Sequence, residues 1–522
     1  MQVGEGSADV SLQPSRRRAT RILFITQCVS FAFVVAQGIV LVPLYLRHID
    51  VATYGGWLAS SQVLNWITLI DPGTDEAVRQ RSAHAYGRRE FGEVGELIGA
   101  GILINLVAAM GVFLVGVLVA ALMEGRFGLT GLAANSVSRA LLILAGASAV
   151  TTAAYALGSP LLALQRASIH GVIYVGGTVA ALIATVGLLY AGWGVSAIPA
   201  GLLVRGSFWL AGWGVSLGHL TRNGEAIRIY FRLQGAKSLV KLSAFTWLGK
   251  ISSALQTGMD GVLIGASLGA SSTAGYILTG RMIDAARTLP DRIGTAVQPS
   301  LAHLFGEARP EKIRLVTARL FRLTFLSSAF LTSIAVVFNR DIMRLWVGEQ
   351  LFGGARLTIL LGLAAYLSNL LNSSYHVMFA SGAVREATVI TTLQGVLKVA
   401  LAYMLLKYLG VSALPTASLI SALLIGVPLL LFRSFSIIRF TTCEQWTVVR
   451  AALSSYAICI AAGIPFLYLR FSFSVPEVMV SVFGFAVLLM SLLYAIHRPF
   501  REEARSALAW LRGVISDRLQ TA

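Results

Sequence analysis

The sequence predicts an all-α integral membrane protein with about 14 transmembrane helices, forming two pseudo-symmetric six-helix bundles plus two extra helices around a central cavity. Three observations support this. Of 522 residues, 56% are hydrophobic and only 13% are charged, whereas about 25% are charged in a typical soluble domain. Apolar runs of about 20 residues, enough to cross a bilayer, recur along the chain. The stretch 239–305 in the middle of the chain also has a weaker sequence repeat near the start of the chain.

The apolar runs define the predicted spans in order. The second and eighth are the weakest, since they are short or polar. The spans lie near 22–46, 54–71, 97–122, 139–163, 169–191, 195–218, 242–265, 273–300, 321–346, 355–380, 387–408, 412–432, 448–469 and 476–496.

Lysine and arginine set the predicted orientation. With the N-terminus inside, 28 of the 42 basic residues fall in inside segments, eight fall outside and six fall within spans. Cytoplasmic loops carry this excess of positive charge. The asymmetry favours an even number of spans with both termini cytoplasmic.

These elements give the expected organisation of the chain. The longest loops are too short for a second domain, and the basic tail has apolar residues at helical spacing. The expected parts are a cytoplasmic N-terminal tail (1–21), a first six-helix bundle (22–218), a basic cytoplasmic linker (219–241), a second six-helix bundle (242–432), a linker with helices 13 and 14 (433–496), and a basic amphipathic C-terminal tail (497–522).

The remaining composition argues against several functions. The net charge of +18 does not indicate nucleic-acid binding, because the basic residues are spaced between apolar runs. The three cysteines, Cys28, Cys443 and Cys459, have neither metal-ligand nor redox spacing. No catalytic or nucleotide-binding motif is present. We therefore expect no enzyme activity, no metal, no cofactor and no nucleic-acid partner.

Charged residues inside the spans mark the candidate site. Each costs about 2.5–3.5 kcal/mol at the bilayer centre, so such groups face protein or water rather than lipid. The in-span cations exceed the acids, which favours an anionic ligand. The predicted substrate-binding residues are Lys250, Arg281, Arg287, Lys398 and Arg205, and the ion-coupling candidates are Asp71, Asp260 and Asp284.

Span 8 allows two main interpretations, and a third in which it is shorter than 273–300 and some of its charges lie at the membrane interface. Arg281, Asp284, Arg287 and Asp291 follow one another at spacings of three, three and four, which places them on one helix face. They could neutralise each other and hold span 8 against another helix, or the arginines could bind a pyrophosphate or acidic sugar. Asp71 also has two possible roles: it caps a helical segment, or it gains and loses a proton during transport. Asp260 and Lys250 lie ten residues apart, so each needs another partner.

Two segments of the chain look alike. The stretch 40–57, continued through 69–88, resembles 262–276 continued through 299–307. Each gives a span, a short outside turn with a Gly-Tyr or Tyr-Gly pair, a weaker span and a basic inside segment. The repeats are six spans apart, so both halves have the same orientation. We expect a symmetry axis along the membrane normal, as in transporters built from parallel repeats.

Short motifs then point to a family. They are Leu69-Ile70-Asp71-Pro72-Gly73, Met259-Asp260-Gly261-Val262-Leu263-Ile264-Gly265, Ala274-Gly275-Tyr276 and Gln298-Pro299-Ser300-Leu301-Ala302. In order and spacing they resemble the polysaccharide or lipid-linked oligosaccharide flippases (Wzx-like) of the multidrug/oligosaccharidyl-lipid/polysaccharide exporter superfamily. Pro72 departs from the family's apolar residue, and span 8 is more charged than usual.

The resemblance implies a flippase of the bacterial inner membrane. Such a protein moves a polyprenyl-pyrophosphate-linked oligosaccharide from the cytoplasmic to the outer leaflet by alternating access, for cell-surface polysaccharide export. Its partners would be that substrate, membrane lipids, and a polysaccharide polymerase with chain-length machinery. The alternatives are a lipid II or drug exporter of the same superfamily, or a polytopic polysaccharide polymerase or glycosyltransferase. The short outside loops disfavour the polymerase.

Overall fold

Helices make up the regular structure of this chain, because backbone groups in a bilayer must form their hydrogen bonds within their own segment. The computed structural model describes residues 38, 40–67, 69, 73–122, 131–164, 166–223, 227–231, 247–306, 309–468 and 475–505. No strand occurs in these ranges. The prediction of an all-α membrane fold is confirmed.

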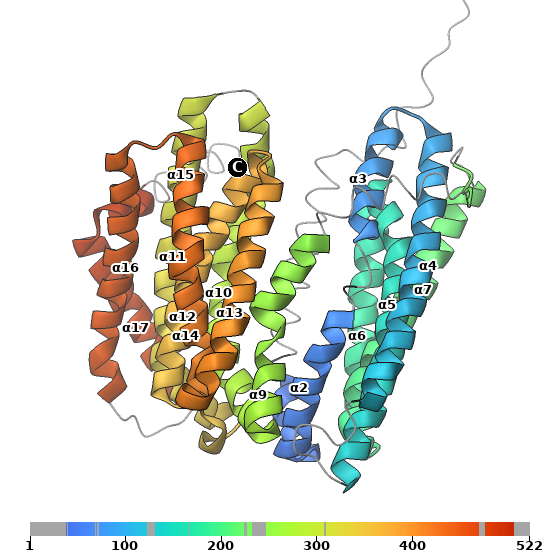
Figure 1. Ribbon diagram of the computed structural model, residues 1–522, viewed down its shortest axis with the longest axis horizontal. Coiled ribbons are helices and arrows are strands. Elements are labelled where there is room, and N and C mark those ends of the chain that lie inside the picture. The colour runs from blue at the N-terminus through green and yellow to red at the C-terminus, as the bar shows by residue number, and fades with distance from the viewer. Residues whose placement is uncertain are drawn as a thin grey trace, which may run out of the picture. The chain divides into compact units, whose positions relative to one another are not determined.

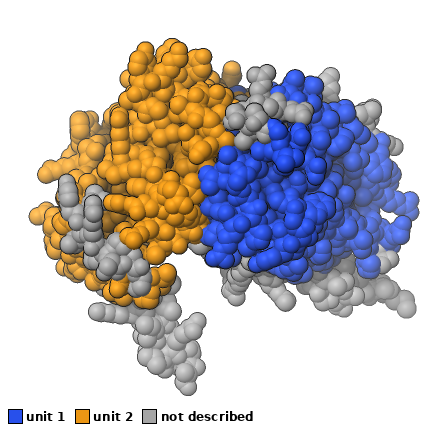
Figure 2. Space-filling model, turned by 90° about the horizontal axis from the view of Figure 1, so that it is seen from below, with its two compact units in different colours: residues 1–250 blue, residues 251–522 orange. Residues whose placement is uncertain are grey.

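The chain divides into two units, residues 1–250 (unit 1) and 251–522 (unit 2), which are coloured separately in Figure 2. The sequence predicts a division at the linker 219–241. The boundary between the two units lies inside the predicted span 242–265, and the predicted domain bounds stay a prediction.

Unit 1 is a bundle built around α5, which packs against α4 and α7, while α6 packs along α7. Its described helices are α2 (Val51–Ile67), α3 (Thr74–Gly87), α4 (Phe91–Leu122), α5 (Gly131–Ala163), α6 (Ala167–Tyr190) and α7 (Ala197–Asn223), with a 3-10 turn, η2 (Gly194–Ser196), before α7. The colours from blue to green in Figure 1 follow this order. Its core includes the fully buried rings of Trp209 and Trp213.

Helix α3 is not among the predicted elements. Its sequence is polar and predicts a basic inside segment, yet residues 74–87 form helix. Ala77, Val78 and Ala85 on one face are buried against α4 and α5. This narrow stripe of small apolar residues is enough to dock the helix on the bundle.

Unit 2 contains the longest helices of the chain. They are α9 (Asp260–Leu268), α10 (Ala270–Gly306), α11 (Pro310–Trp346), α12 (Ala355–Ala380), α13 (Val384–Leu409), α14 (Ala413–Ser421), α15 (Phe432–Ile438), α16 (Thr442–Tyr468) and α17 (Val475–Ile496), with π-helical segments η3 (Ala254–Gly258) and η6 (Ala422–Leu431) and 3-10 turns η4 (Glu349–Leu351) and η5 (Gly410–Ser412). Helices α10, α11 and α12 pack against one another, and α13 packs against α14. Helices α16 and α17 both pack on α11 and lie at one edge of the unit in Figure 1.

Nine stretches of the described residues are long and apolar enough to cross a membrane. One of them, 384–438, holds two predicted spans, because the chain reverses at Gly410, whose φ is +56°. Three other predicted spans are short (α2), broken (247–268) or interrupted by charges (α10). The first predicted span, 22–46, lies largely outside the described residues. The chain is a multi-pass membrane protein, and the count of 14 stays a prediction.

The turn between the seventh and eighth spans is shorter than expected. The sequence predicts an outside turn at 266–272, but α9 ends at Leu268 and α10 begins at Ala270. Only Gly269 separates them, with a φ of +87° that favours glycine. The motif Ala274-Gly275-Tyr276 therefore lies inside α10.

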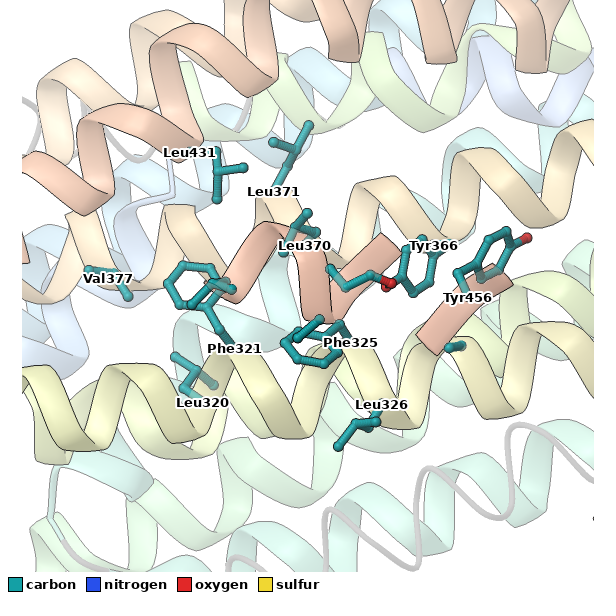
Figure 3. Close-up of a cluster of buried hydrophobic side chains, with 14 of the residues drawn as sticks. Leu320, Phe321, Phe325, Leu326, Tyr366, Leu370, Leu371, Val377, Leu431 and Tyr456 are labelled. Carbon is teal, nitrogen blue, oxygen red and sulfur yellow. The ribbon is translucent and has the colours of Figure 1, made fainter. Parts of the chain in front are cut away.

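The core of unit 2 lies between α11, α12 and α16. Figure 3 shows Phe321 and Phe325 of α11 beside Leu370 of α12, and all three are buried. The rings of Tyr366 and Tyr456 stack with centroids 4.2 Å apart, and the Tyr366 hydroxyl donates to the carbonyl of Ala452 at 2.8 Å. Helix α16 is thereby fixed to the second bundle.

Polar side chains also hold these helices together. Asn339 on α11 donates to the carbonyl of Thr279 on α10 at 3.0 Å and to the hydroxyl of Thr358 on α12 at 3.2 Å. Asn369 on α12 donates to the Ser328 hydroxyl on α11 at 2.9 Å. Interhelical hydrogen bonds of this kind stabilise helix association in a bilayer, because the hydrophobic effect does not drive helices together in lipid.

Candidate functional site

The seventh predicted span is broken in the middle. Residues 247–253 are helical, 254–258 form the π-helical segment η3, and α9 starts at Asp260. The break coincides with Gln256, Thr257 and Gly258, which are polar or glycine in an otherwise apolar run. A π-helical turn shifts the backbone hydrogen-bond pattern and is frequent at functional sites. Carbonyl oxygens near it need other donors inside a membrane.

Lys398 of α13 supplies one such donor and also neutralises Asp260. Its Nζ atom donates to the carbonyl oxygen of Gln256 and lies 2.7 Å from Oδ1 of Asp260. The other carboxylate oxygen, Oδ2, accepts a hydrogen bond of 2.9 Å from the hydroxyl of Tyr276 on α10. Gln256 in turn donates from its side chain to the carbonyl of Thr391 at 3.2 Å. Three segments of unit 2 therefore meet at one carboxylate.

This ion pair is withdrawn from solvent. The side chains of Lys398 and Asp260 are 6% and 17% exposed. Removing one member of a buried pair costs about 3–5 kcal/mol, because the other charge is left uncompensated. The sequence argument places Lys398 among the substrate-binding residues and gives it no partner by name. The structure gives it Asp260 as its partner, and its contact with a substrate stays a prediction.

A glycine allows the close approach of helices that the pair requires. Gly395 lies three residues before Lys398 on α13, and a Cβ atom there would lie 2.8 Å from the Cβ of Leu255 in η3. Small residues let membrane helices approach closely. Gly395 thus brings α13 against the broken segment and places Lys398 within reach of Asp260.

The charged stripe of α10 splits into two parts. In the first, Arg281 and Asp284 are exposed on unit 2, and Nε of Arg287 lies 3.7 Å from Oδ1 of Asp284. In the second, Asp291 turns to α12. Its Oδ1 accepts a 3.0 Å hydrogen bond from Asn372 and lies 3.6 Å from Nε2 of His376.

The interpretation in which the stripe holds span 8 against another helix describes its second part, and anion binding by the arginines stays a prediction. Asp291 is held by α12 through Asn372 and His376, and Nδ1 of His376 also lies 3.0 Å from Oε1 of Gln298. Arg287 pairs with Asp284, and Arg281 lies three residues before Asp284 on the same helix. The first half of the stripe keeps a surplus positive charge, whereas the second half ties α10 to α12.

Unit 1 holds the other predicted cations. The guanidinium carbon of Arg205 lies 4.7 Å from the ring centroid of Trp209, a cation–π contact. Lys250 is half-buried in the helical segment 247–253. Asp71 lies outside the described residues.

Trp209 also belongs to an aromatic stack that the sequence argument missed. The Trp209 ring stacks on Tyr174 at 4.7 Å, and the Trp213 ring stacks on His170 at 4.7 Å. The pairs 170/174 and 209/213 are each four residues apart, so their helical spacing is visible in the sequence. Tyr276 enters the sequence argument only as part of a turn motif, without its contact to Asp260.

One family model matches part of the chain. Residues 251–404 match the MatE family model. That range includes the Asp260 network, from Gln256 to Lys398. A sequence search of curated proteins found no match.

Solved structures extend the likeness to most of the chain. The lipid II flippase MurJ, in an inward closed conformation, has a TM-score of 0.66 at 12% identity, covering 91% of this chain and 99% of MurJ. This chain has the fold of MurJ and the MATE transporters. An inward-facing multidrug resistance MATE family transporter of the MOP superfamily has a TM-score of 0.62 at 13% identity, covering 81% of this chain and 100% of the transporter. A mutant form of the Vibrio cholerae MATE transporter VcmN has a TM-score of 0.57 at 14% identity, covering 82% of this chain and 98% of that transporter.

Proposed function

We propose that this protein is a flippase that moves a polyprenyl-pyrophosphate-linked oligosaccharide from the cytoplasmic to the outer leaflet of a bacterial inner membrane. The observation that carries the proposal is the division of charges in unit 2. Asp260 and Lys398 form a closed pair, whereas Arg281, Asp284 and Arg287 form an open set with one surplus positive charge. The MATE fold supports transport, and the surplus charge supports an anionic substrate.

The open set is the proposed substrate contact. An arginine on a membrane helix cannot face hydrocarbon without a large cost, so Arg281 and Arg287 face protein or water. Guanidinium groups bind phosphate oxygens with paired hydrogen bonds. These arginines would neutralise the negative charge of a pyrophosphate inside the membrane, where it otherwise has no counter-charge. Arg205 and Lys250 of unit 1 are the remaining proposed contacts.

The closed pair is the proposed coupling element. The carboxylate of Asp260 can pair with Lys398, or it can bind a transported proton or metal cation. Once such an ion neutralises the carboxylate, its attraction for Lys398 is weaker. Ion binding would then release α13 from the broken span and favour one conformation of the alternating-access cycle. Asp71 and Asp284 remain the other coupling candidates.

Reconstitution tests the substrate directly. The purified protein is reconstituted into liposomes that contain a polyprenyl-pyrophosphate-linked oligosaccharide with a fluorescent sugar. An impermeant quencher added outside measures the fraction of this lipid that reaches the outer leaflet. We expect the quenchable fraction to rise with the protein and not with the Arg281→Gln/Arg287→Gln variant. Arg439→Gln, an exposed arginine outside the stripe, is the matched control. A wild-type signal equal to that of empty liposomes would rule out this substrate.

Two comparisons name the second candidates. MurJ is a lipid II flippase, and another similar structure is a multidrug resistance transporter. Lipid II with the same fluorescent assay, and a cationic dye in an uptake assay, would separate these functions. Transport of the cationic dye that survives Arg281→Gln/Arg287→Gln would favour a drug exporter.

A further inference from the structure

A groove at one end of unit 2 lies apart from the site described above. It has a volume of about 820 Å³ and runs between the first turns of α13 and the segment formed by η6 and α15. Its walls include Arg385, Glu386 and Val389 on one side and Leu429, Phe432 and Arg433 on the other. Ligand sites in proteins have volumes of about 300–1,000 Å³. The groove is therefore large enough for part of a lipid molecule.

Charge and apolar surface are separated along the groove. Arg385 is the second residue of α13, and Arg433 pairs with the adjacent Glu386, so both arginines lie at the end of the groove where α13 begins, which we call the mouth. Val389 follows Arg385 by four residues, and Leu429 precedes Arg433 by four, which places both about one helical turn deeper. Val389, Leu429 and Phe432 are 41%, 46% and 46% exposed. An exposed apolar wall below a pair of cations matches the amphipathic shape of a phospholipid.

The arginines keep capacity for an anion. Nε of Arg433 lies 2.7 Å from Oε1 of Glu386, and its Nη2 lies 3.4 Å from Oε2. A guanidinium has five N–H donors, so three remain. The described part of the chain gives Arg385 no ion pair. With one carboxylate against two guanidinium groups, the mouth of the groove has a net positive charge.

The predicted orientation places this mouth at the cytoplasmic surface, where anionic lipids gather. We propose that the groove binds an anionic phospholipid, with its phosphate on Arg385 and Arg433 and an acyl chain along Val389, Leu429 and Phe432. A purely apolar occupant would leave the arginines without a counter-charge. A zwitterionic lipid would gain less, because its own cation opposes them. The proposal does not depend on which substrate the protein transports.

Native mass spectrometry of the purified full-length protein tests this. Phosphatidylglycerol and phosphatidylcholine compete for binding in equal amounts. Each arginine near an anionic lipid surface contributes about fivefold in affinity, so we expect Arg385→Ala to lower phosphatidylglycerol retention about fivefold. Glu386→Ala/Arg433→Ala removes the ion pair as a unit, and combining it with Arg385→Ala should abolish the preference. Arg439→Ala, exposed beyond the end of α15, should retain it.

Two further measurements keep the proposal open to refutation. Val389→Trp places a large ring in the groove and should reduce retention of phosphatidylglycerol while both arginines remain. Monodisperse elution shows that each variant is folded. Equal retention of the two lipids by the wild-type protein would overturn the proposal, as would an unchanged preference in the triple variant. Displacement of phosphatidylglycerol by equimolar polyprenyl phosphate would assign the groove to the carrier lipid instead and overturn it too.

Discussion

At the scale of single residues, Asp260 shows how this chain tolerates charge inside a membrane. Both of its carboxylate oxygens accept hydrogen bonds, one from Lys398 and one from Tyr276. A charged group buried away from water is stable only when it is paired and hydrogen-bonded. The network therefore has to be tested as a unit, because removing one member leaves a charge behind.

The ion pair gives the first prediction. Asp260→Asn or Lys398→Met alone should lower stability by about 3–5 kcal/mol, since each leaves one buried charge. The double variant removes both charges and should recover most of the loss. Thermal unfolding of the detergent-solubilised protein measures this. Lys407→Met, an exposed lysine of the same helix, should change little. If the double variant is no more stable than the single variants, the two residues do not stabilise the protein through their ion pair.

Tyr276 gives a second prediction. Tyr276→Phe keeps the ring and removes one hydrogen bond to a charged group, which contributes about 1.5–3 kcal/mol. We expect a smaller loss in thermal stability than for either single charge variant. In the background of Asp260→Asn/Lys398→Met the same change should matter less, because the acceptor no longer carries charge. Equal losses in both backgrounds would mean that the hydroxyl acts independently of Asp260.

At the scale of helices, the approach of α13 to η3 depends on Gly395. Gly395→Ala should separate the two segments and weaken the Lys398–Asp260 pair, because the added Cβ would lie 2.8 Å from the Cβ of Leu255. Gly484→Ala on α17 is the matched control, since no atom lies within 4 Å of its Cβ position. Alanine favours a helix over glycine by about 1 kcal/mol, so the control should be neutral or stabilising. Thermal unfolding of both variants measures the difference, and equal melting temperatures would contradict it.

Helix positions are largely predictable from apolar length. The span predicted at 355–380 coincides with α12, because glycine and loop residues limit it at both ends. The span predicted at 321–346 ends correctly but begins late, since α11 starts at Pro310 with an amphipathic first part outside the apolar run. The π-helical segments η3 and η6 are not predictable in this way, because their hydrogen-bond pattern leaves little trace in hydrophobicity.

The sequence predicts which residues belong to the candidate site, but it does not predict which of them contact each other. Charge in a span singles out Asp260 and Lys398 individually. They are separated by 138 residues and lie on different helices, so no sequence spacing connects them. Tyr276 joins the site only because the turn before α10 is a single residue, which brings the start of α10 beside Asp260. Contacts between helices depend on packing that a linear pattern does not encode.

At the scale of the whole molecule, orientation in the membrane is the property that both proposals share. The substrate would reach Arg281 from the cytoplasm, and the phospholipid groove would open to the same side. The basis for this orientation is the placement of 28 basic residues on one side against eight on the other. Unit 2 supplies two residues that report on it, Ser271 at the start of α10 and Cys443 at the start of α16, and both are exposed.

These two residues should label from opposite sides. Between them the chain passes through α10, α11, α12, α13 and the continuous α14–α15 segment, an odd number of crossings. In intact spheroplasts, an impermeant maleimide should miss native Cys443 and modify it only after permeabilisation. Ser271→Cys in a Cys443→Ser background should be modified without permeabilisation. Both proteins also carry Cys28→Ser, so buried Cys459 is the one other cysteine and serves as the unreactive reference. Labelling of Cys443 from outside would show that the orientation is the reverse of the predicted one. Labelling of both residues from the same side would show that these helices do not make an odd number of membrane crossings.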